Sequence, residues 1–333
     1  MLKQIALFIF SIISFYQCNS QSEKINGLSF VSSKDSINKK HIQPVKKASA
    51  NYVALMPFGF IKNIESPKVA FNGRKQWYGE TGKGLKQYAN EFKKENIKFM
   101  IKPQIWIWGG TYTGTIEMNS EEDWKVLEDS YKAFIITYAK IAEELDADVF
   151  CIGTELEKFV INRPEYWKGL IQGVKKVYGG KITYAANWDE FKRVSFWNEL
   201  DFIGIDAYFP LNVEKTPTVK DFEISWEPHK IEIQKVQKTY NKPILFTEFG
   251  YRSIDFTGKE PWNSDKIIGN INLKAQENAT QAIYNQFWKE EWFAGGFLWK
   301  WFHNHNNVGG ENNNRFTPQN KPTEKLIQRL YGN

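Results

Sequence analysis

The feature that most constrains the fold is a series of eight short β-rich runs separated by helical stretches. The runs cover residues 25–31, 52–56, 97–101, 148–153, 181–186, 202–206, 243–247 and 296–299, and the third extends toward Trp106. Most of them are continuously apolar and show no polar alternation. Such runs are typical of parallel strands that are covered on both faces.

Helical patterns lie between most of these runs, whereas the first and fifth connections are short. The patterns cover residues 84–95, 120–145, 164–178, 227–240, 273–289 and 323–330. In the longest, apolar residues from Trp124 to Ile141 recur at three- and four-residue spacing, which gives a helix one apolar face. Strands that alternate with helical crossovers predict an α/β fold, a single (β/α)8 TIM barrel over residues 25–333.

The length and composition are consistent with that fold and exclude several functions. The 333 residues contain no linker or repeat that divides the chain, and barrels of about 250 residues often form one domain. The net charge of +6 is spread along the chain, whereas a nucleic-acid partner would require a clustered basic stripe. Aromatic residues make up 16% of the chain. Most are expected in the core, but flat rings also line pockets for ligands with apolar faces.

The N-terminus has the pattern of an export signal. Lys3 precedes an apolar run from Ile5 to Tyr16, which is too short for a membrane span. We therefore expect a signal peptide at residues 1–18 and a short polar tether at 19–24. Cys18 directly follows the apolar run and is a candidate for lipidation, which would give a cell-surface or periplasmic lipoprotein. Cleavage after Ser20, with release of a secreted protein, is the alternative.

Two carboxylates follow predicted strands and are the candidate catalytic residues. Glu155 follows the fourth run and Glu248 follows the seventh. In a (β/α)8 barrel the carboxyl ends of the strands form the active-site mouth, so both side chains are expected to meet there. Two facing carboxylates suit glycoside hydrolysis, in which one protonates the leaving oxygen and the other attacks the anomeric carbon. Either Glu alone could equally cap a helix or pair with a Lys, and Glu157 is interpreted as a helix-start charge.

Four segments resemble glycoside hydrolase family 113, a retaining family of clan A known chiefly for endo-β-1,4-mannanases. The segments are 153–157 (GTELE), 201–210 (DFIGIDAYFP), 242–250 (KPILFTEFG) and 295–301 (GGFLWKW). The resemblance covers about residues 25–330. It implies that Glu155 is the acid/base, that Glu248 is the nucleophile, and that Trp299 forms the floor under the sugar. Much of the clan has Asn immediately before the acid, whereas this chain has Thr154, whose hydroxyl is a shorter donor to the sugar 2-hydroxyl.

Polar and aromatic residues at other strand ends are candidates for substrate binding. Tyr208 follows the sixth run and is placed to hydrogen-bond the nucleophile. Asn187 and Trp188 follow the fifth run, where they would meet a sugar hydroxyl and a sugar face. A turn role is the alternative for this pair, and core packing is the alternative for Trp299.

The third run continues into a further group of candidates. It contains Lys102, Gln104, Trp106 and Trp108. Because successive strand residues face opposite sides, we expect that these four do not all point inward, and we take Lys102, Gln104 and Trp106 as the set that shares the inward face. Trp77, in the long loop after the second run, is equally suited to walling a cleft or packing on the surface.

Other patterns do not indicate cofactor or metal chemistry. His303 and His305 form an H-x-H pair, but we interpret them as polar loop residues because no Cys cluster accompanies them. Cys151, within a predicted strand, is expected to be a small buried apolar residue. No phosphate-binding glycine loop follows a strand. We therefore expect no cofactor and no metal.

The sequence predicts a retaining endo-β-1,4-mannanase that acts on a β-linked polysaccharide or oligosaccharide. Two alternatives remain open at this point. One is a non-catalytic glycan-binding lipoprotein on a barrel scaffold, suggested by the export signal and the many aromatic residues. The other is a clan A β-glycosidase with a different substrate or an exo-acting mode.

Overall fold

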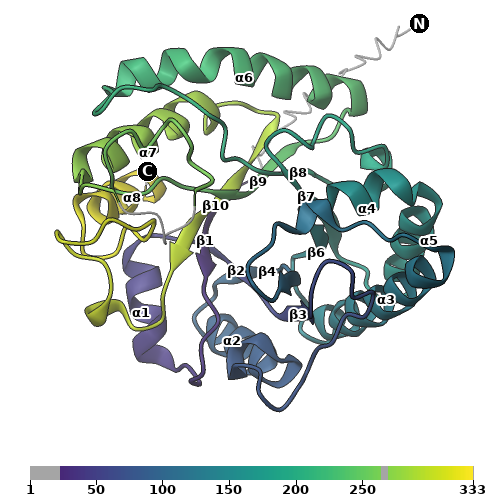
Figure 1. Cartoon of the computed structure of the whole chain (residues 1–333). Coiled ribbons are helices and arrows are strands. Elements are labelled where there is room, and N and C mark those ends of the chain that lie inside the picture. The colour runs from purple at the N-terminus through teal and green to yellow at the C-terminus, as the bar shows by residue number, and fades with distance from the viewer. Residues whose placement is uncertain (1–22, 264–268, 333) are drawn as a thin grey trace, which may run out of the picture.

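A computed structural model describes residues 23–263 and 269–332, so the predicted signal peptide and Cys18 lie outside the described part of the chain. Parallel strands form a closed barrel at the centre, and the helices surround it (Figure 1). In barrel order from β1 the neighbours are β10, β9, β8, β7, β6, β4 and β2. The predicted TIM barrel is therefore confirmed. The barrel strands are β1 (Ile25–Phe30), β2 (Tyr52–Leu55), β4 (Lys98–Ile101), β6 (Val149–Thr154), β7 (Lys181–Asn187), β8 (Ile203–Asp206), β9 (Ile244–Phe249) and β10 (Phe293–Trp301).

The helices follow the sequence signals closely where the apolar pattern is strong. In α3, Ser120 accepts a hydrogen bond from the Asp123 backbone N–H, and three acidic residues occupy the first turn, where they favour the positive helix end. Pro164 begins α5, as its preset backbone angle favours. The helices are α1 (Lys39–Lys47), α2 (Gly82–Lys94), α3 (Glu121–Glu144), α4 (Glu157–Asn162), α5 (Pro164–Lys175), α6 (Val219–Tyr240), α7 (Leu273–Phe287) and α8 (Pro322–Tyr331).

The first connection was expected to be short, but it contains α1. This helix buries only Ile42 and Val45, and Pro44 lies within it, so its sequence has little helical signal. The fifth connection is short as predicted, with a 3-10 turn at Trp197–Glu199 in place of an α-helix.

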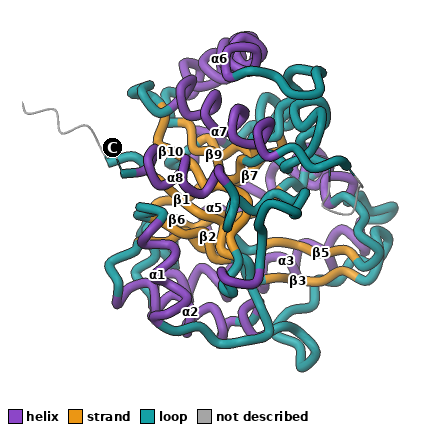
Figure 2. Tube along the Cα trace, turned by 90° about the vertical axis from the view of Figure 1, so that its left-hand side faces the viewer, coloured by secondary structure: helices purple, strands orange, loops and turns teal. Residues whose placement is uncertain are grey.

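The third run is not one strand that extends to Trp106, as the sequence suggested. The chain leaves the barrel at Pro103 and continues as β5 (Gln104–Ile107), which pairs in parallel with β3 (Phe58–Ile61) in a separate two-stranded sheet. These two strands lie side by side beyond the barrel strands (Figure 2). They extend one wall of the molecule past the barrel mouth.

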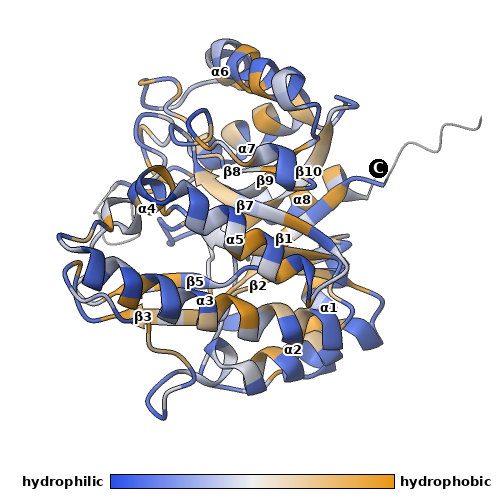
Figure 3. Ribbon diagram, turned by 90° about the vertical axis from the view of Figure 1, so that its right-hand side faces the viewer, coloured by the Kyte–Doolittle hydropathy of each residue, from blue (hydrophilic) through white to orange (hydrophobic). Residues whose placement is uncertain are grey.

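The core explains most of the aromatic content. Trp167, Trp197, Trp226 and Trp301 are fully buried. The helices contain both apolar and polar residues (Figure 3), and apolar residues of α3 such as Trp124 and Leu127 are buried. At the N-terminal edge of the described chain, Lys24 Nζ donates hydrogen bonds to the carbonyls of Glu290 and Phe293. Within residues 23–263 and 269–332, none of the helices is both long and apolar enough to cross a bilayer.

Candidate active site

The carboxyl ends of the barrel strands surround a cavity of about 690 Å³. Glu155 after β6, Asp206 at the end of β8, Glu248 in β9 and Trp299 in β10 all line it. Asp206 and Glu248 are register partners on neighbouring strands. The structure thus brings the two predicted carboxylates into one cavity.

Glu248 is held by three side-chain donors. Lys102 Nζ lies 2.6 Å and Gln104 Nε2 lies 2.9 Å from Glu248 Oε1. Tyr208 donates to the other oxygen, Oε2, at 2.9 Å. An ionised carboxylate only accepts hydrogen bonds, so this donor set suits it. The sequence predicted all three side chains as site residues, and Tyr208 as the partner of Glu248.

Lys102 is completely buried and bridges two carboxylates. Its ammonium also contacts Asp206, at 2.9 and 3.1 Å from the two carboxylate oxygens, and Asp206 accepts a further bond from Thr247 Oγ1. Burial alone would lower the pKa of Lys102, but the charges of Asp206 and Glu248 outweigh it and raise that pKa. Burial raises the pKa of Asp206, and the Lys102 ammonium opposes this rise. Sequence reasoning did not assign this partner role to Asp206, because the ion pair joins residues 104 positions apart.

Glu155 has a different environment. Its backbone φ is +50°, a conformation that L-residues rarely adopt and that surrounding contacts must maintain. The Glu155 N–H donates to the Ala185 carbonyl, and Thr113 Oγ1 donates to the Glu155 carbonyl. Burial, followed by the negative charges of Asp206 and Glu248, raises the pKa of the Glu155 carboxyl well above its usual value. A raised pKa favours the protonated form of a carboxyl group, which is the form that a general acid requires.

Tyr112 and Asn187 lie beside Glu155. Asn187 Nδ2 donates to the Tyr112 hydroxyl at 3.0 Å, and the Tyr112 ring lines the cavity. Burial raises the pKa of Tyr112, with a further contribution from the Glu155 charge. The sequence predicted Asn187 but not Tyr112, which lies in an irregular loop with no strand-end signal. Trp188 is not among the residues that line the cavity, and its ring stacks on Trp262.

Four tryptophans form the apolar walls of the cavity. Trp299 and Trp77 line it together with Trp106 and Trp108, which are 46% and 69% exposed. The expectation that Lys102, Gln104, Trp106 and Trp108 do not all face inward is wrong. Gln104, Trp106 and Trp108 are spaced two apart along and just after β5, and all three line the cavity. Lys102, which precedes the break at Pro103, contacts Glu248 together with Gln104.

Close packing fixes Trp299 beside the nucleophile candidate. A Cβ atom at Gly250 would lie 2.5 Å from the Trp299 carbonyl oxygen, so only glycine permits this approach of the two segments. The backbone of Trp299 therefore lies directly against the segment that follows Glu248.

The remaining sequence candidates have structural contacts. Glu157 begins α4 and pairs with Arg193, in agreement with its interpretation as a helix-start charge. Cys151 is buried, as predicted, and burial raises the pKa of its thiol to about 11. Thr154 lines the cavity, and its buried Oγ1 has no oxygen or nitrogen partner in the described residues, although the Cys151 thiol lies close by.

The His pair makes separate contacts. His305 pairs with Glu324 at 2.6 Å, and His303 lies 3.6 Å from Asp35. The described residues include no group of three or more His, Cys, Asp or Glu side chains arranged to hold a metal ion.

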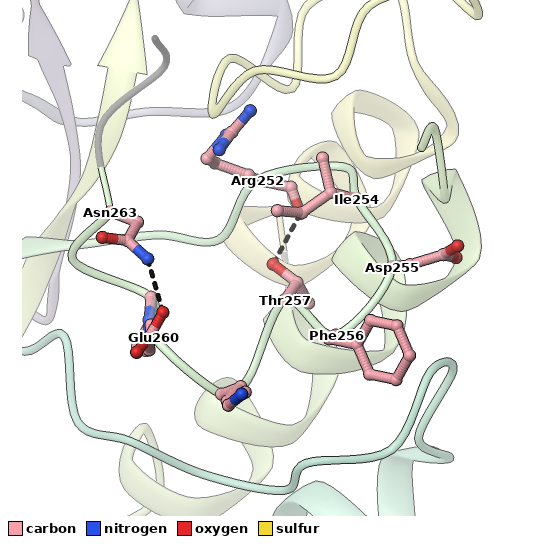
Figure 4. Close-up of a pocket in the computed structure, with 9 residues that line it drawn as sticks. Arg252, Ile254, Asp255, Phe256, Thr257, Glu260 and Asn263 are labelled. Atoms are coloured by element: carbon pink, nitrogen blue, oxygen red, sulfur yellow. Dashed lines mark hydrogen bonds between the residues drawn. The ribbon is translucent and has the colours of Figure 1, made fainter. Parts of the chain in front are cut away.

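A second cavity of about 150 Å³ lies within the loop that follows β9. Figure 4 shows the residues that line it, which lie between Arg252 and Asn263. The Thr257 hydroxyl donates a hydrogen bond to the Arg252 carbonyl, and the Asn263 side chain donates one to Glu260. None of the sequence-predicted site residues lines this cavity. The larger cavity is therefore the candidate active site.

A (β/α)8 barrel with two differently held carboxylates at its mouth defines the class of glycoside hydrolases. The comparison with known families agrees with this class. The chain matches Glycoside Hydrolase Family 113 over residues 31–321 and belongs to that family. No curated protein sequence matches the chain significantly.

Several solved structures share the fold. The GH113 β-mannanase AaManA from Alicyclobacillus acidocaldarius, in complex with ManMIm, superposes with a TM-score of 0.81 at 23% identity, covering 93% of this chain and 97% of that chain. A GH113 β-1,4-mannanase gives 0.79 at 24% identity, covering 93% and 99% of the two chains. A Ruminococcus gnavus β-glucuronidase gives 0.59 at 15% identity, and the match spans 92% of this chain but 50% of that one. At these identities the likeness shows the barrel fold.

Proposed function

We propose that this glycoside hydrolase is a retaining endo-β-1,4-mannanase that uses Glu248 as nucleophile and Glu155 as acid/base. The observation that carries the proposal is that the two carboxyl groups share one cavity but have opposite surroundings. Glu248 accepts bonds from Lys102, Gln104 and Tyr208, while burial and neighbouring charges raise the pKa of Glu155. Such a difference in environment is what assigns separate acid and nucleophile roles to two carboxyl groups.

The reaction then proceeds in two displacements. A Glu248 oxygen attacks the anomeric carbon while the Glu155 proton passes to the glycosidic oxygen, so the leaving sugar departs neutral. The resulting glycosyl ester on Glu248 is cleaved by water, whose proton Glu155 accepts, and the anomeric configuration of the substrate is retained. In retaining enzymes the two carboxyl groups lie about 5–5.5 Å apart, and we expect this separation here.

We infer the substrate class from the tryptophan rings that line the cavity and from the similar structures of the same family. Exposed tryptophan rings along the cavity suit the apolar faces of successive pyranose units. The similar structures of this family are β-mannanases. We therefore assign β-1,4-linked mannan, with endo action, to this chain.

An activity panel tests the proposal. The purified protein is incubated with mannan, glucomannan, cellulose and xylan, and new reducing ends are measured together with the initial anomer of the product by proton NMR. We expect cleavage of mannan and glucomannan, a β-anomer as first product, and no turnover by Glu248→Ala. Binding of mannan without new reducing ends would instead support a glycan-binding protein, and cleavage of only xylan or cellulose would reassign the substrate.

We further propose that the protein is exported and that Cys18 carries a lipid. The support is the sequence of residues 1–18 alone. Fractionation of cells that express the full chain and its Cys18→Ala variant tests this. The native protein is expected with the membranes and the variant in the soluble export fraction. Equal distribution of the two would exclude the anchor.

A further inference from the structure

Glu190 is a buried titratable residue that the reaction above does not use. It lies in the turn after β7, its side chain is 1% exposed, and burial raises its pKa to about 8. A buried carboxyl group is costly unless hydrogen bonds satisfy it. Its position close to Glu155 in the fold suggests a role in the site.

Both oxygens of Glu190 accept hydrogen bonds. The Tyr184 hydroxyl donates to Oε1 at 2.6 Å, and the Asn187 backbone N–H donates to Oε2 at 2.9 Å. The Tyr184 oxygen in turn accepts the Leu156 N–H at 2.7 Å. The bonds therefore run in one direction, from the residue that follows Glu155 toward the carboxyl group of Glu190.

The same carboxyl group is connected to the other side of Glu155. The Asn187 backbone N–H donates to Glu190, and the Asn187 side-chain amide donates to the Tyr112 hydroxyl. The next residue, Thr113, donates to the Glu155 carbonyl. These contacts form a closed circuit of residues that includes the candidate acid. Glu155 has a backbone φ of +50° within that circuit. A backbone in this region of φ persists only when its surroundings over-determine it.

We propose that Glu190 is a positioning residue for Glu155, acting through Tyr184 and Leu156 on one side and through Asn187 and Tyr112 on the other. The inference rests on the acid role proposed above for Glu155. Glu190 is fully covered by protein and is not among the residues that line the cavity, so it acts through these neighbours. Both oxygens of its carboxyl group face donors, the Tyr184 hydroxyl and the Asn187 N–H.

The variants Glu190→Gln and Tyr184→Phe separate this role from simple packing. The amide of Gln places an NH₂ group opposite one of two donors, so one bond is lost at nearly unchanged volume. Tyr184→Phe keeps the buried ring and removes only the hydroxyl that joins Leu156 to Glu190. Glu199→Gln, on the surface turn at Trp197–Glu199, is the matched control.

The readout is the dependence of kcat/KM on the leaving group, with 2,4-dinitrophenyl and phenyl β-mannobioside as substrates. The dinitrophenolate departs without a proton, whereas the phenolate needs the acid. A misplaced Glu155 should therefore lower kcat/KM for the phenyl substrate by roughly 10–100-fold, within the range that general acid catalysis supplies. The dinitrophenyl substrate should change by less than about 3-fold, since the reduced acid function does not affect it.

The outcomes are distinguishable. Glu155→Ala with the same substrates tests the acid role itself: an equal loss on both substrates would remove the proposed function. If Glu155→Ala shows the split but Glu190→Gln and Tyr184→Phe lower both substrates equally, or neither, the positioning role is wrong. If Glu190→Gln does not fold, as judged by circular dichroism, Tyr184→Phe decides the question.

Discussion

The two sides of the cavity hold the same kind of residue in opposite ways. On the β9 side, Glu248 lies among donors, and the buried Lys102 ammonium joins it to Asp206. On the β6 side, the Glu155 backbone has a positive φ and accepts a hydrogen bond from Thr113, while burial and negative charge raise the pKa of its carboxyl. The difference teaches that the chemical role of a glutamate is set by the groups that the fold brings around it.

Beside the complete loss expected for Glu248→Ala, the largest expected effect is on the β6 side. Replacement Glu155→Gln removes the acid, and kcat/KM on mannan should fall by roughly 10²–10⁴-fold, the usual contribution of general acid catalysis. In the native enzyme, kcat/KM on mannan should fall on the alkaline side as Glu155 loses its proton. With the 2,4-dinitrophenyl substrate this alkaline limb should be absent, and an unchanged limb would contradict the acid role.

The same variant makes a prediction about stability. The folded pKa of Glu155 is raised above its unfolded value of about 4.5, so the unfolded chain releases its proton first. The contribution of Glu155 to the free energy of unfolding therefore falls as pH rises above about 4.5, by up to about 1.4 kcal/mol per pH unit until the folded pKa is reached. Glu155→Gln has no carboxyl group at this position and does not undergo this loss. The advantage of the variant, its free energy of unfolding minus that of the native protein, should therefore grow with pH. A shrinking advantage would contradict the raised pKa.

The β9 side is tested by Lys102→Met. The change leaves Asp206 and Glu248 buried without their cation, which should lower the free energy of unfolding by about 3–5 kcal/mol at neutral pH. The loss should be smaller in acid, because Asp206, whose pKa burial raises, then takes up a proton. Urea unfolding at both pH values measures it. Lys125→Met, which breaks an exposed pair with Asp129, is the control and should cost under about 1 kcal/mol. Equal losses in the two variants would mean that the buried cation has no special role.

A smaller effect is expected for Tyr208→Phe. It removes one donor to the Glu248 carboxylate, and a hydrogen bond to a charged group contributes about 1.5–3 kcal/mol. If that contribution is made in the transition state, kcat/KM should fall by roughly 10–150-fold. Tyr166→Phe, whose hydroxyl bonds the Glu128 carbonyl away from the cavity, should leave kcat/KM unchanged. A fully active Tyr208→Phe enzyme would show that the donor set around Glu248 is redundant.

The smallest effect is expected at the rim. Trp108→Ala should raise KM for mannan by several-fold, about 1 kcal/mol for one lost ring contact, and should leave kcat/KM for an aryl mannobioside unchanged. Trp262→Ala, which removes an exposed ring outside the main cavity, is the control. Lower kcat/KM on both mannan and the aryl mannobioside would show that Trp108 affects the reaction at the carboxylates and not only the binding of the polymer.

The sequence predicts the barrel well because its strands are continuous apolar runs and its long helices have regular apolar stripes. It does not predict α1, whose short pattern contains Pro44, or the break at Pro103 that moves Gln104 into a second sheet. It predicts Glu155 and Glu248 because both directly follow the apolar runs that indicate strands. It misses the roles of Asp206, Tyr112 and Glu190, because these depend on side-chain contacts between residues distant in sequence or within irregular loops.

The assignment of the two carboxylates is tested most directly by azide rescue of Glu248→Ala and Glu155→Ala with 2,4-dinitrophenyl β-mannobioside. Without its nucleophile, the Glu248 variant should let azide attack the substrate directly and give the inverted α-glycosyl azide. The Glu155 variant should still form the ester on Glu248, which azide then opens to the β-glycosyl azide. The account predicts these opposite anomers, and the same anomer from both variants, or the two exchanged, would contradict it.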